Sequence, residues 1–270
     1  MTLLIVGANG NFSLALQEIL GDNSFRIINK NLYGDWDNSE SKLTSIIRKN
    51  VEECNTKYLI NTVGIVSKNC DPEFVKYWNY YFPKHLYQIC ENLNLTLVTL
   101  GSVHENVPDM PTGNPYLESK KSLERFLMTK EFKNSFHFQF HTWYGGKNVN
   151  PEMFLGQLIT SIRGGRIFNM SSGEQVREYH HVIDDATCVL TNLENGMLGT
   201  LSISHGELLT LEEIARKLFR HFNCENLLKL NQISSPNIEV TNKMALPVHA
   251  VKMKFRPTME GLIEYVAKNI

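Results

Sequence analysis

Three polar side chains in the middle of the chain have the types and spacing that protonation of a carbonyl oxygen requires. Ser102 comes first, and Tyr116 and Lys120 follow it at i, i+4 spacing. A free tyrosine titrates near pH ~10, so we expect the ammonium of Lys120 to lower the pKa of Tyr116 and make its phenol a better proton donor. Ser102 would hydrogen-bond the carbonyl oxygen and orient it. The trio therefore predicts a catalytic site.

The Tyr-x-x-x-Lys pattern occurs twice, so the surrounding sequence has to decide which copy is catalytic. The copies are Tyr80 with Lys84 and Tyr116 with Lys120. Residues 95–100 form an apolar run expected to be a strand, and Ser102 follows at its carboxyl end, where open α/β sheets bind ligands. Tyr116 opens a helical pattern, so it shares a helix face with Lys120. Tyr80 lies among aromatic residues and is interpreted as core or interface.

The N-terminal residues predict a binding site for the phosphates of a nucleotide. Residues 3–6 are an apolar run expected to form a buried strand, and the apolar residues within 11–20 have helical spacing. Gly7 suits a tight turn between them, and Gly10 lets a diphosphate approach the helix N-terminus. Ser13 stands where the Gly-x-x-Gly-x-x-Gly pattern has its third glycine. An ordinary strand-to-helix turn is the alternative interpretation.

The end of the second expected strand indicates which nucleotide is bound. An acidic residue there would hydrogen-bond the ribose of NAD, but Asn29 and Lys30 occupy this position. An amide beside an ammonium suits a 2′-phosphate, which favours NADPH, with NAD(H) possible and a solvated Lys30 as the alternative. Asn29 and Asp35 are six positions apart, so we expect no full helix between the second and third strands.

These motifs together resemble those of the extended short-chain dehydrogenases/reductases, a family that modifies nucleotide-activated sugars. The resemblance covers nearly the whole chain. Further matching segments are residues 60–64 at the expected fourth strand, 78–79, 143–145 and 172–182. The resemblance implies an α/β fold, a Rossmann-type doubly wound parallel sheet with a smaller C-terminal substrate-binding lobe. The expected units are an NAD(P)-binding core at residues 1–145 and a mainly substrate-binding lobe at 146–270, with segments returning to the core.

The resemblance also implies roles for individual residues. Cofactor contacts fall on Gly7, Asn9, Gly10, Asn11, Phe12, Asn29, Lys30, Asp35, Thr62, Val63, Gly64, Asn79, Lys120 and Tyr144. Substrate contacts fall on Ser102, Val103, His104, Tyr116, Thr142 and Arg177. The implied catalytic residues are Tyr116, Lys120 and Ser102. Arg256 is interpreted either as a further nucleotide contact or as a surface arginine.

Two departures from the family pattern near Ser102 narrow the reaction that the resemblance implies. Sugar 4,6-dehydratases of the family use an acidic pair directly after this serine, but Val103 and His104 follow it here. The bifunctional epimerase-reductases use a nearby cysteine, and none is present. The short stretch before Asp35 resembles the dTDP-4-dehydrorhamnose reductase branch. We therefore expect NADPH-dependent reduction of the C4 keto group of a nucleotide-activated 4-keto-6-deoxy sugar, in the biosynthesis of lipopolysaccharide, capsule or another surface polysaccharide.

Two other functions stay open at the level of the sequence. A nucleotide-sugar 4-epimerase would retain NAD tightly, and would oxidise and re-reduce the same carbon. A non-enzymatic NADP(H)-sensing protein on the same fold would be expected to lack the tyrosine–lysine pair, which is intact here. The nucleotide base, the sugar stereochemistry and the face that receives hydride depend on loop shape, which these motifs do not specify.

Composition limits the classes of partner. The 27 basic and 28 acidic residues give a net charge of −1, which argues against a nucleic-acid surface or a polybasic membrane anchor. No apolar run is long enough to suggest a membrane span. The five cysteines form no close pair, so we expect a reducing cytoplasm. His180 and His181 are adjacent, and no Cys-x-x-Cys occurs, so we expect no metal. The expected partner is a nucleotide-sugar small molecule.

Two further patterns concern the helices. Thr210 and Glu213 have the spacing of a capping box, which predicts that a helix of the substrate lobe begins at Thr210. A homodimer is expected, as in much of the family, through the helix after Tyr116 and a second apolar helix. The residues that mark this second helix are Trp78, Tyr81, Leu86 and Ile89.

Overall fold

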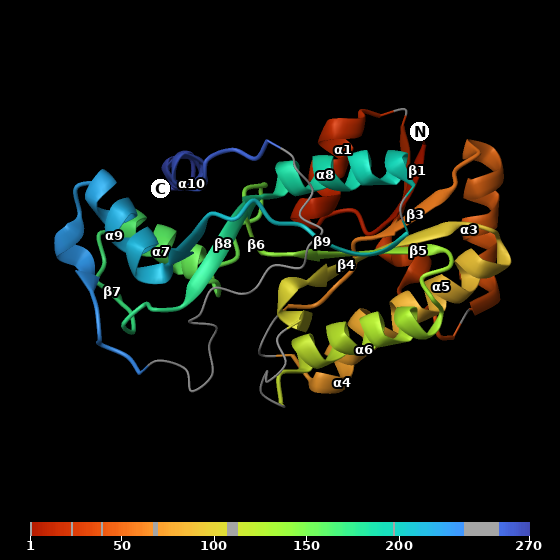
Figure 1. Ribbon diagram of the computed structural model, residues 1–270, viewed down its shortest axis with the longest axis horizontal. Helices are drawn as coiled ribbons and strands as arrows, with labels where there is room; N and C mark the ends of the chain where they lie inside the picture. The colour runs from red at the N-terminus through yellow and green to blue at the C-terminus, as the bar shows by residue number, and fades with distance from the viewer. Residues whose placement is uncertain are drawn as a thin grey trace. The chain divides into compact units, whose positions relative to one another are not determined.

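The computed structural model describes residues 2–22, 24–38, 40–66, 70–106, 113–196, 198–234 and 254–270. The chain divides into two compact units (Figure 1). Unit 1 comprises Met1–Phe140 and Ala186–Ile203, and unit 2 comprises His141–Asp185 and Ser204–Ile270. The sequence analysis placed the division after residue 145, whereas the structure divides the chain after Phe140 and returns Ala186–Ile203 to unit 1.

Unit 1 is built on a six-stranded sheet in the order β2-β1-β3-β4-β5-β9. Its strands are β1 (Leu3–Val6), β2 (Phe25–Ile28), β3 (Tyr58–Asn61), β4 (Thr96–Ser102), β5 (Ser135–Phe140) and β9 (Gly199–Ser202). All neighbouring pairs are parallel. The chain runs outward from β1 in both directions, so the carboxyl ends of β1 and β3 border the switch point where such sheets bind ligands. The doubly wound α/β fold of Rossmann type predicted from the sequence is confirmed.

Helices cover both faces of this sheet. They are α1 (Asn11–Leu20), α2 (Lys30–Tyr33), α3 (Glu40–Cys54), α4 (Pro72–Lys76), the π-helical turn η1 (Tyr77–Tyr81), α5 (Phe82–Asn92), the 3-10 turn η2 (Val103–Asn106), α6 (Pro115–Thr129) and α8 (Val182–Asn195). Figure 1 shows α1 and α8 on one side of the strands and α5 and α6 on the other. Alternate residues of a strand point to opposite faces, and all four residues of β1 are fully buried between the two helix layers.

Two helices between β2 and β3 correct the sequence analysis. The expected absence of a full helix there is wrong, because the 15-residue α3 follows the single turn of α2. Residues 60–64 consequently lie at the third strand, and not at a fourth. Parallel strands need a crossover of a dozen or more residues, and α3 provides it while burying Leu43 and Ile47.

The aromatic helix expected at a dimer interface belongs to the core of unit 1. Trp78, Leu86 and Ile89 are buried in one apolar cluster together with Leu123 and Leu127 of α6. Tyr80 packs against the same cluster, as its interpretation as core predicted. Dimer contacts through Trp78, Leu86 and Ile89 are therefore excluded, because these side chains already pair α5 with α6 inside one protomer.

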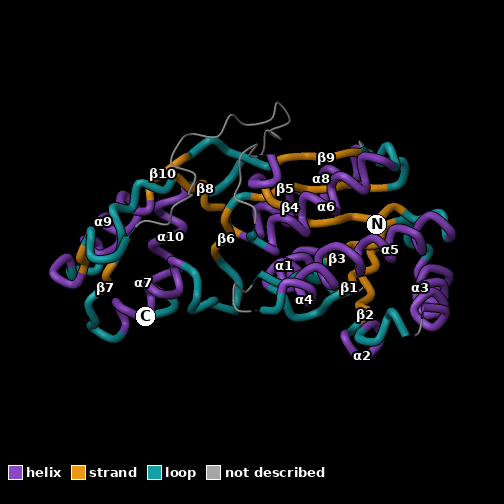
Figure 2. Tube along the Cα trace, turned by 90° about the horizontal axis from the view of Figure 1, so that it is seen from below, coloured by secondary structure: helices purple, strands orange, loops and turns teal. Residues whose placement is uncertain are grey.

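The described residues of unit 2 form two small sheets. The strands β6 (Thr142–Tyr144), β8 (Val176–His181) and β10 (Leu208–Thr210) form the first, and β7 (Phe168–Asn169) and β11 (Leu228–Lys229) form the second. Figure 2 shows helices α7 (Phe154–Arg163), α9 (Leu211–His221) and α10 (Thr258–Ala267) around these strands, with the 3-10 turn η3 (Glu225–Leu227) after α9. The predicted capping box is confirmed, since Thr210 and Glu213 bond reciprocally at the start of α9.

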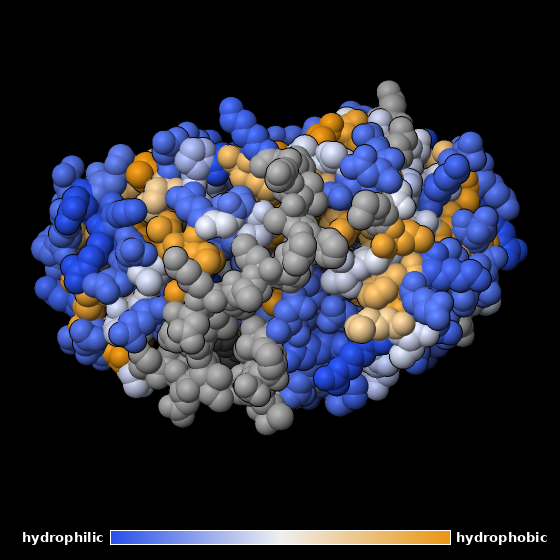
Figure 3. Space-filling view, in the orientation of Figure 1, coloured by the Kyte–Doolittle hydropathy of each residue, from blue (hydrophilic) through white to orange (hydrophobic). Residues whose placement is uncertain are grey.

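The surface agrees with the balanced composition. The described residues on the face drawn in Figure 3 are mostly hydrophilic, with apolar residues in small groups. Within the described ranges, no helix is both long and apolar enough to cross a membrane.

Candidate functional site

Ser102, Tyr116 and Lys120 are brought together where β4 ends and α6 begins. Ser102 is the last residue of β4. Asn114 caps α6 by accepting a hydrogen bond from the N–H of Leu117, and Pro115 occupies the first helical position, so Tyr116 lies in the first turn. Lys120, which is 8% exposed, donates from Nζ to the carbonyl of Leu100 at 2.6 Å. This bond attaches the face of α6 that carries Lys120 to the end of β4.

The electrostatics of Tyr116 differ from the sequence-based expectation. Burial of the phenol raises its pKa, and the negative charge of Glu105 raises it further. Burial lowers the pKa of Lys120, although Glu105 opposes this shift. The Lys120 ammonium bonds a backbone carbonyl and lies 5.8 Å from the centre of the Tyr116 ring. The expectation that Lys120 lowers the pKa of Tyr116 is therefore wrong in this structure, and Tyr116 is a neutral phenol at neutral pH.

Glu105, which the sequence analysis passed over, is a buried carboxylate directly beneath this site. It lies on η2, and its Oε1 accepts the N–H of Ser102 at 2.6 Å. Its Oε2 pairs with Nε2 of His137 at 2.8 Å and accepts from Gln139 at 3.1 Å. The signal was present in the sequence of β5, where His137 and Gln139 alternate with phenylalanines and therefore share one face of the strand.

The glycine turn has the geometry expected for close approach of a ligand. Gly7 has φ +98°, and a Cβ there would lie 2.7 Å from Oγ1 of Thr62, so this position requires glycine. A Cβ at Gly10 would meet nothing within 4 Å, and no side chain caps α1 there. Ser13, in place of the third glycine, donates to the carbonyl of Gly7 at 2.8 Å and ties the helix to the turn. Asn9 is exposed and Asn11 begins α1.

Several other predicted cofactor residues converge on the carboxyl end of β3. A Cβ on Gly64 would lie 3.3 Å from Oδ1 of Asn79 and 3.9 Å from Nζ of Lys120. Asn79 uses both ends of its amide on the backbone of Ile65, at 2.8 Å each, so it positions this loop. Thr62 donates to the carbonyl of Val6 at 2.9 Å, which joins the ends of β3 and β1.

Other predicted cofactor residues lie elsewhere in unit 1. Asn29 precedes α2 without a side-chain capping bond, and Lys30 is the first residue of α2. Both are exposed, as is Asp35. The ring of Phe12 is buried against Phe140, so this side chain serves the core. Val63 packs against the same apolar cluster as Trp78.

The predicted substrate residues divide between the two units. In unit 1, Nδ1 of His104 lies 3.2 Å from Oγ of Ser102, whereas Val103 is 1% exposed and belongs to the core. Thr142 and Arg177 lie in unit 2, where Arg177 donates to the carbonyl of Val176.

Tyr144 and Arg256 make structural contacts within unit 2. Tyr144 is buried in the apolar core of this unit, against Gly261 of α10. Arg256 is held by Asp184 through both Nε and Nη2, at 3.1 and 2.7 Å. This ion pair accounts for Arg256 without a nucleotide, although it does not decide between the two interpretations of the sequence.

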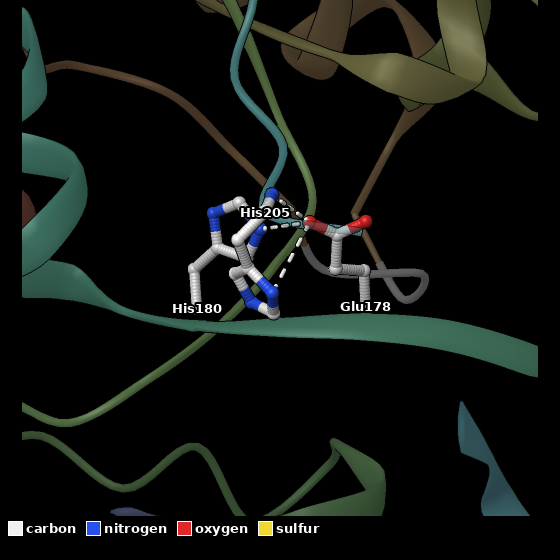
Figure 4. Close-up of side chains that lie close together, drawn as sticks. All are labelled: Glu178, His180 and His205. Carbon is white, nitrogen blue, oxygen red and sulfur yellow. Dashed lines mark hydrogen bonds and ion pairs between the residues drawn. The ribbon is translucent and has the colours of Figure 1, made fainter. Parts of the chain in front are cut away.

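A cluster of titratable groups in unit 2 has the composition of a metal site. Glu178, His180 and His205 place possible ligand atoms within 4.8 Å of one another (Figure 4). These atoms already bond within the protein: His180 joins Asp185 at 2.7 Å and Glu178 at 2.8 Å, and Glu178 accepts the N–H of His205 at 2.6 Å. An imidazole between two carboxylates donates from both nitrogens, so the cluster is organised around a proton on His180.

We predict a pH-dependent contribution of His180 to stability. Burial lowers its pKa, but Asp185 and Glu178 raise it more, and the result is about 9 against an ordinary 6.5. A raised histidine pKa stabilises the fold fully below the unfolded value and loses this contribution as the pH rises through about 9. His180→Gln should therefore lower the free energy of unfolding at pH ~7 by on the order of 2 kcal/mol, as measured by urea unfolding. The difference from wild type should be smaller at pH ~10.

The exposed His221 supplies the matched control for this prediction. His221→Gln should follow wild type at both pH values, because its side chain lies at the surface of α9. A difference between His180→Gln and wild type that is equal at pH ~7 and pH ~10 would show that His180 is neutral in the folded protein.

Known proteins share this fold. No protein-family model and no curated protein matches the sequence. Among solved structures, the UDP-N-acetylglucosamine 4-epimerase of Methanobrevibacter ruminantium is 17% identical, with TM-score 0.78 over 98% of this chain and 97% of that one. The dTDP-4-dehydrorhamnose reductase of Bacillus anthracis in complex with NADP is 17% identical, with TM-score 0.77 over 99% of each chain. The dTDP-glucose 4,6-dehydratase of the same organism, in complex with NAD, is 15% identical, with TM-score 0.75 over 99% and 96%.

These neighbours are an epimerase, a reductase and a dehydratase, and the reductase holds NADP and the dehydratase NAD. Because one fold serves three reactions among them, the likeness establishes the architecture of this chain, and the choice of reaction has to come from its own residues.

Proposed function

We propose that this protein is an NADPH-dependent reductase of the C4 keto group of a nucleotide-activated 4-keto-6-deoxy sugar. The observation that carries the proposal is the convergence of Ser102, Tyr116 and Lys120 beside the carboxyl ends of the central strands, with Tyr116 kept as a phenol. A reductase needs a protonated donor beside the carbonyl oxygen, and Tyr116, which is half-buried and neutral, can supply the proton. The dTDP-4-dehydrorhamnose reductase with the same fold supports the substrate class.

Each residue of the trio has a distinct task in this reaction. Ser102 orients the carbonyl oxygen, and Tyr116 delivers its phenolic proton to that oxygen. Lys120 is anchored on the carbonyl of Leu100 and lies close to Gly64 at the predicted cofactor side, where it would hold the nicotinamide ribose. NADPH, when bound, supplies hydride to the carbonyl carbon. The open space at Gly10 and the positive φ of Gly7 fit a diphosphate at the start of α1.

The carboxylates near Ser102 favour reduction over dehydration. Dehydration needs an acid and a base on the sugar, whereas the carboxylate of Glu105 faces inward to Ser102, His137 and Gln139. Burial raises the pKa of Glu105, but His137, Lys120 and the Ser102 N–H lower it more, so this group stays ionised. An ionised carboxylate whose oxygens are hydrogen-bonded inside the protein carries no proton to give and cannot protonate a leaving hydroxyl.

A 4-epimerase with tightly held NAD is the second candidate, because the structure with TM-score 0.78 is a 4-epimerase. The test combines the purified protein with NADPH and a panel of dTDP-, CDP-, GDP- and UDP-4-keto-6-deoxy sugars. Oxidation of NADPH with one of them supports the reductase and identifies the nucleotide. Stoichiometric NAD in the purified protein, with interconversion of 4-epimers and no net NADPH consumption, supports the epimerase. An intact fold that binds NADP(H) but acts on no member of the panel supports a sensor.

We predict that Lys30 sets the preference for NADPH. Lys30 is the first residue of α2 and follows the end of β2. The 2′-phosphate of the adenosine ribose would lie there, within reach of the Lys30 ammonium. Lys30→Ala should weaken NADPH binding about tenfold and leave NADH binding unchanged, because only the former loses a charge-assisted contact. Fluorescence titration measures both affinities, and Lys49→Ala, on the exposed face of α3, is the control. Equal losses for both cofactors would contradict this assignment.

The remaining proposals concern the setting of the enzyme. We propose action in the cytoplasm, in the supply of sugars for surface polysaccharide. We also propose a homodimer, through the faces of α4 and η1 that expose Phe74 (47%) and Tyr81 (39%). Sedimentation at micromolar concentration tests the dimer, and a monomer would remove it.

A further inference from the structure

The inference concerns Gln139, a fully buried side chain of β5 whose amide makes four hydrogen bonds. Its Nε2 donates to Oε2 of Glu105 at 3.1 Å and to Oε1 of Glu124 at 2.9 Å. Its Oε1 accepts from Nδ2 of Asn106 at 2.7 Å and from Oγ of Ser202 at 2.6 Å. These bonds use both hydrogens and both lone pairs of the amide, so its neighbours fix its orientation.

The two carboxylates determine which way the amide of Gln139 points. An ionised carboxylate can only accept hydrogen bonds, so the nitrogen of the amide must face Glu105 and Glu124. The oxygen then faces the two side chains that can donate, Asn106 and Ser202. The partners belong to η2, α6 and β9. One side chain of β5 therefore joins three other elements of unit 1.

The bond to Glu105 connects Gln139 with Ser102. Oε2 of Glu105 accepts from Gln139, and Oε1 of the same carboxylate accepts the N–H of Ser102 at 2.6 Å. In the parallel pairing of β4 with β5, Gly101 lies opposite Gln139. A Cβ on Gly101 would lie 2.8 Å from Oε1 of Glu105, so glycine leaves room for the carboxylate there. Gln139 thus reaches the backbone of Ser102 through one intervening side chain.

The bond to Glu124 attaches α6 to the same amide. Tyr116, Lys120 and Glu124 follow one another at i, i+4 and i+8, so they share one face of α6. Lys120 fastens this face to β4 through the carbonyl of Leu100 at 2.6 Å, and Glu124 fastens it to β5 one turn later. A helix held at one point can pivot about that point, whereas two points a turn apart also fix its direction. Tyr116 lies one turn before the first of these points.

We propose that Gln139 is a positioning residue that sets the placement of Tyr116 relative to Ser102. One hydrogen of its amide holds the glutamate that fixes Ser102, and the other holds the glutamate that fixes α6. The proposal rests on the proposed function, because this spacing matters where both residues act on one carbonyl oxygen. Gln139 acts through Glu105 and Glu124 and is not itself a catalytic residue.

The test cuts the network at Glu124, its half-buried end on α6. Glu124→Ala removes the acceptor and leaves Glu105 bonded to Gln139. We expect kcat to fall about tenfold or more with KM unchanged, because a displacement of about 1 Å costs a proton donor at least that much. Hydrogen exchange measured by mass spectrometry should become several-fold faster in the first two turns of α6, because this face has lost an anchor.

Ser202→Ala is the matched control. It removes a 2.6 Å bond to the same amide and leaves the links to Ser102 and α6 in place. It should keep wild-type kcat and wild-type exchange in α6. Glu124→Gln keeps an acceptor oxygen and should restore both readouts. Glu124→Met keeps the volume of the side chain without an acceptor, so it should reproduce the losses of Glu124→Ala and replaces that variant if it does not fold.

The outcomes separate this inference from the proposed function. Equal changes in Glu124→Ala and Ser202→Ala would overturn the inference, since the amide would then only stabilise the fold. Where a sugar is reduced, a fall in kcat without faster exchange in Glu124→Ala, or faster exchange without a fall in kcat, overturns it as well. If the wild-type protein reduces no sugar on the panel, the proposed function fails. Faster exchange of α6 in Glu124→Ala alone then upholds the anchor, and unchanged exchange refutes it.

Discussion

Replacing Tyr116 with phenylalanine is expected to lower kcat for NADPH-dependent reduction by about 10² to 10⁴, the usual contribution of a positioned proton donor. The ring is kept, so the contact with Lys120, 5.8 Å from the ring centre, is kept as well. Affinity for NADPH should therefore match wild type. The measurements are the loss of NADPH absorbance under saturating substrate and the fluorescence titration of NADPH.

The chain offers a matched control in Tyr80→Phe. Lys84 lies 5.8 Å from the centre of the Tyr80 ring, the same spacing as between Lys120 and Tyr116. Only Lys120 is anchored at the end of β4, through Leu100. Tyr80→Phe should therefore keep full activity. Comparable losses in the two variants, or full activity in Tyr116→Phe, would show that the trio has been assigned the wrong role.

Adding a side chain at Gly10 is expected to weaken NADPH binding at least tenfold without destabilising the fold. A Cβ there meets nothing within 4 Å, so Gly10→Val has room in the protein. The same space lies beside the N-terminus of α1, where backbone N–H groups and the helix dipole attract a diphosphate. The test is fluorescence titration of NADPH together with urea unfolding of each variant.

Gly7→Ala, unlike Gly10→Val, should destabilise the fold. With φ +98° and a Cβ 2.7 Å from Oγ1 of Thr62, it should lower the free energy of unfolding by about 1–3 kcal/mol. If Gly10→Val binds NADPH as wild type does, the start of α1 is not where the phosphates lie.

β1, α1 and the start of α9 could be predicted from the sequence because the interactions that form them are local. The apolar run of β1, the helical spacing of α1 and the reciprocal bonds of Thr210 and Glu213 depend on residues within a few positions of one another. The structure has β1 at Leu3–Val6 and α1 at Asn11–Leu20, as the sequence predicts. The same local spacing marks α3, where Leu43, Ile47 and Val51 recur every four residues and pack on the core. The sequence analysis missed this helix because it weighed only the distance from Asn29 to Asp35.

Glu105 shows why the electrostatics could not be predicted in the same way. It stands three positions after Ser102, but its charge matters because the parallel register of β4 and β5 pairs Thr99 with His137. That register brings His137 to Glu105 on η2. The raised pKa of Tyr116 comes first from the burial of its own phenol, and the charge of Glu105 adds to it. Burial and charge interaction both depend on how close side chains lie in space, including side chains that are far apart in the sequence.

The sequence by itself determined which groups are available for the proposed chemistry, because the phenol, the ammonium and the hydroxyl are properties of Tyr116, Lys120 and Ser102 wherever they lie. It also determined the strand, turn and helix that precede them, since backbone preferences are local. Only the tertiary structure decided how the groups are tuned. Burial and the charge of Glu105 set the protonation of Tyr116, and the carbonyl of Leu100 holds Lys120 in place. Solvent exclusion and through-space charge depend on packing, which no short segment contains.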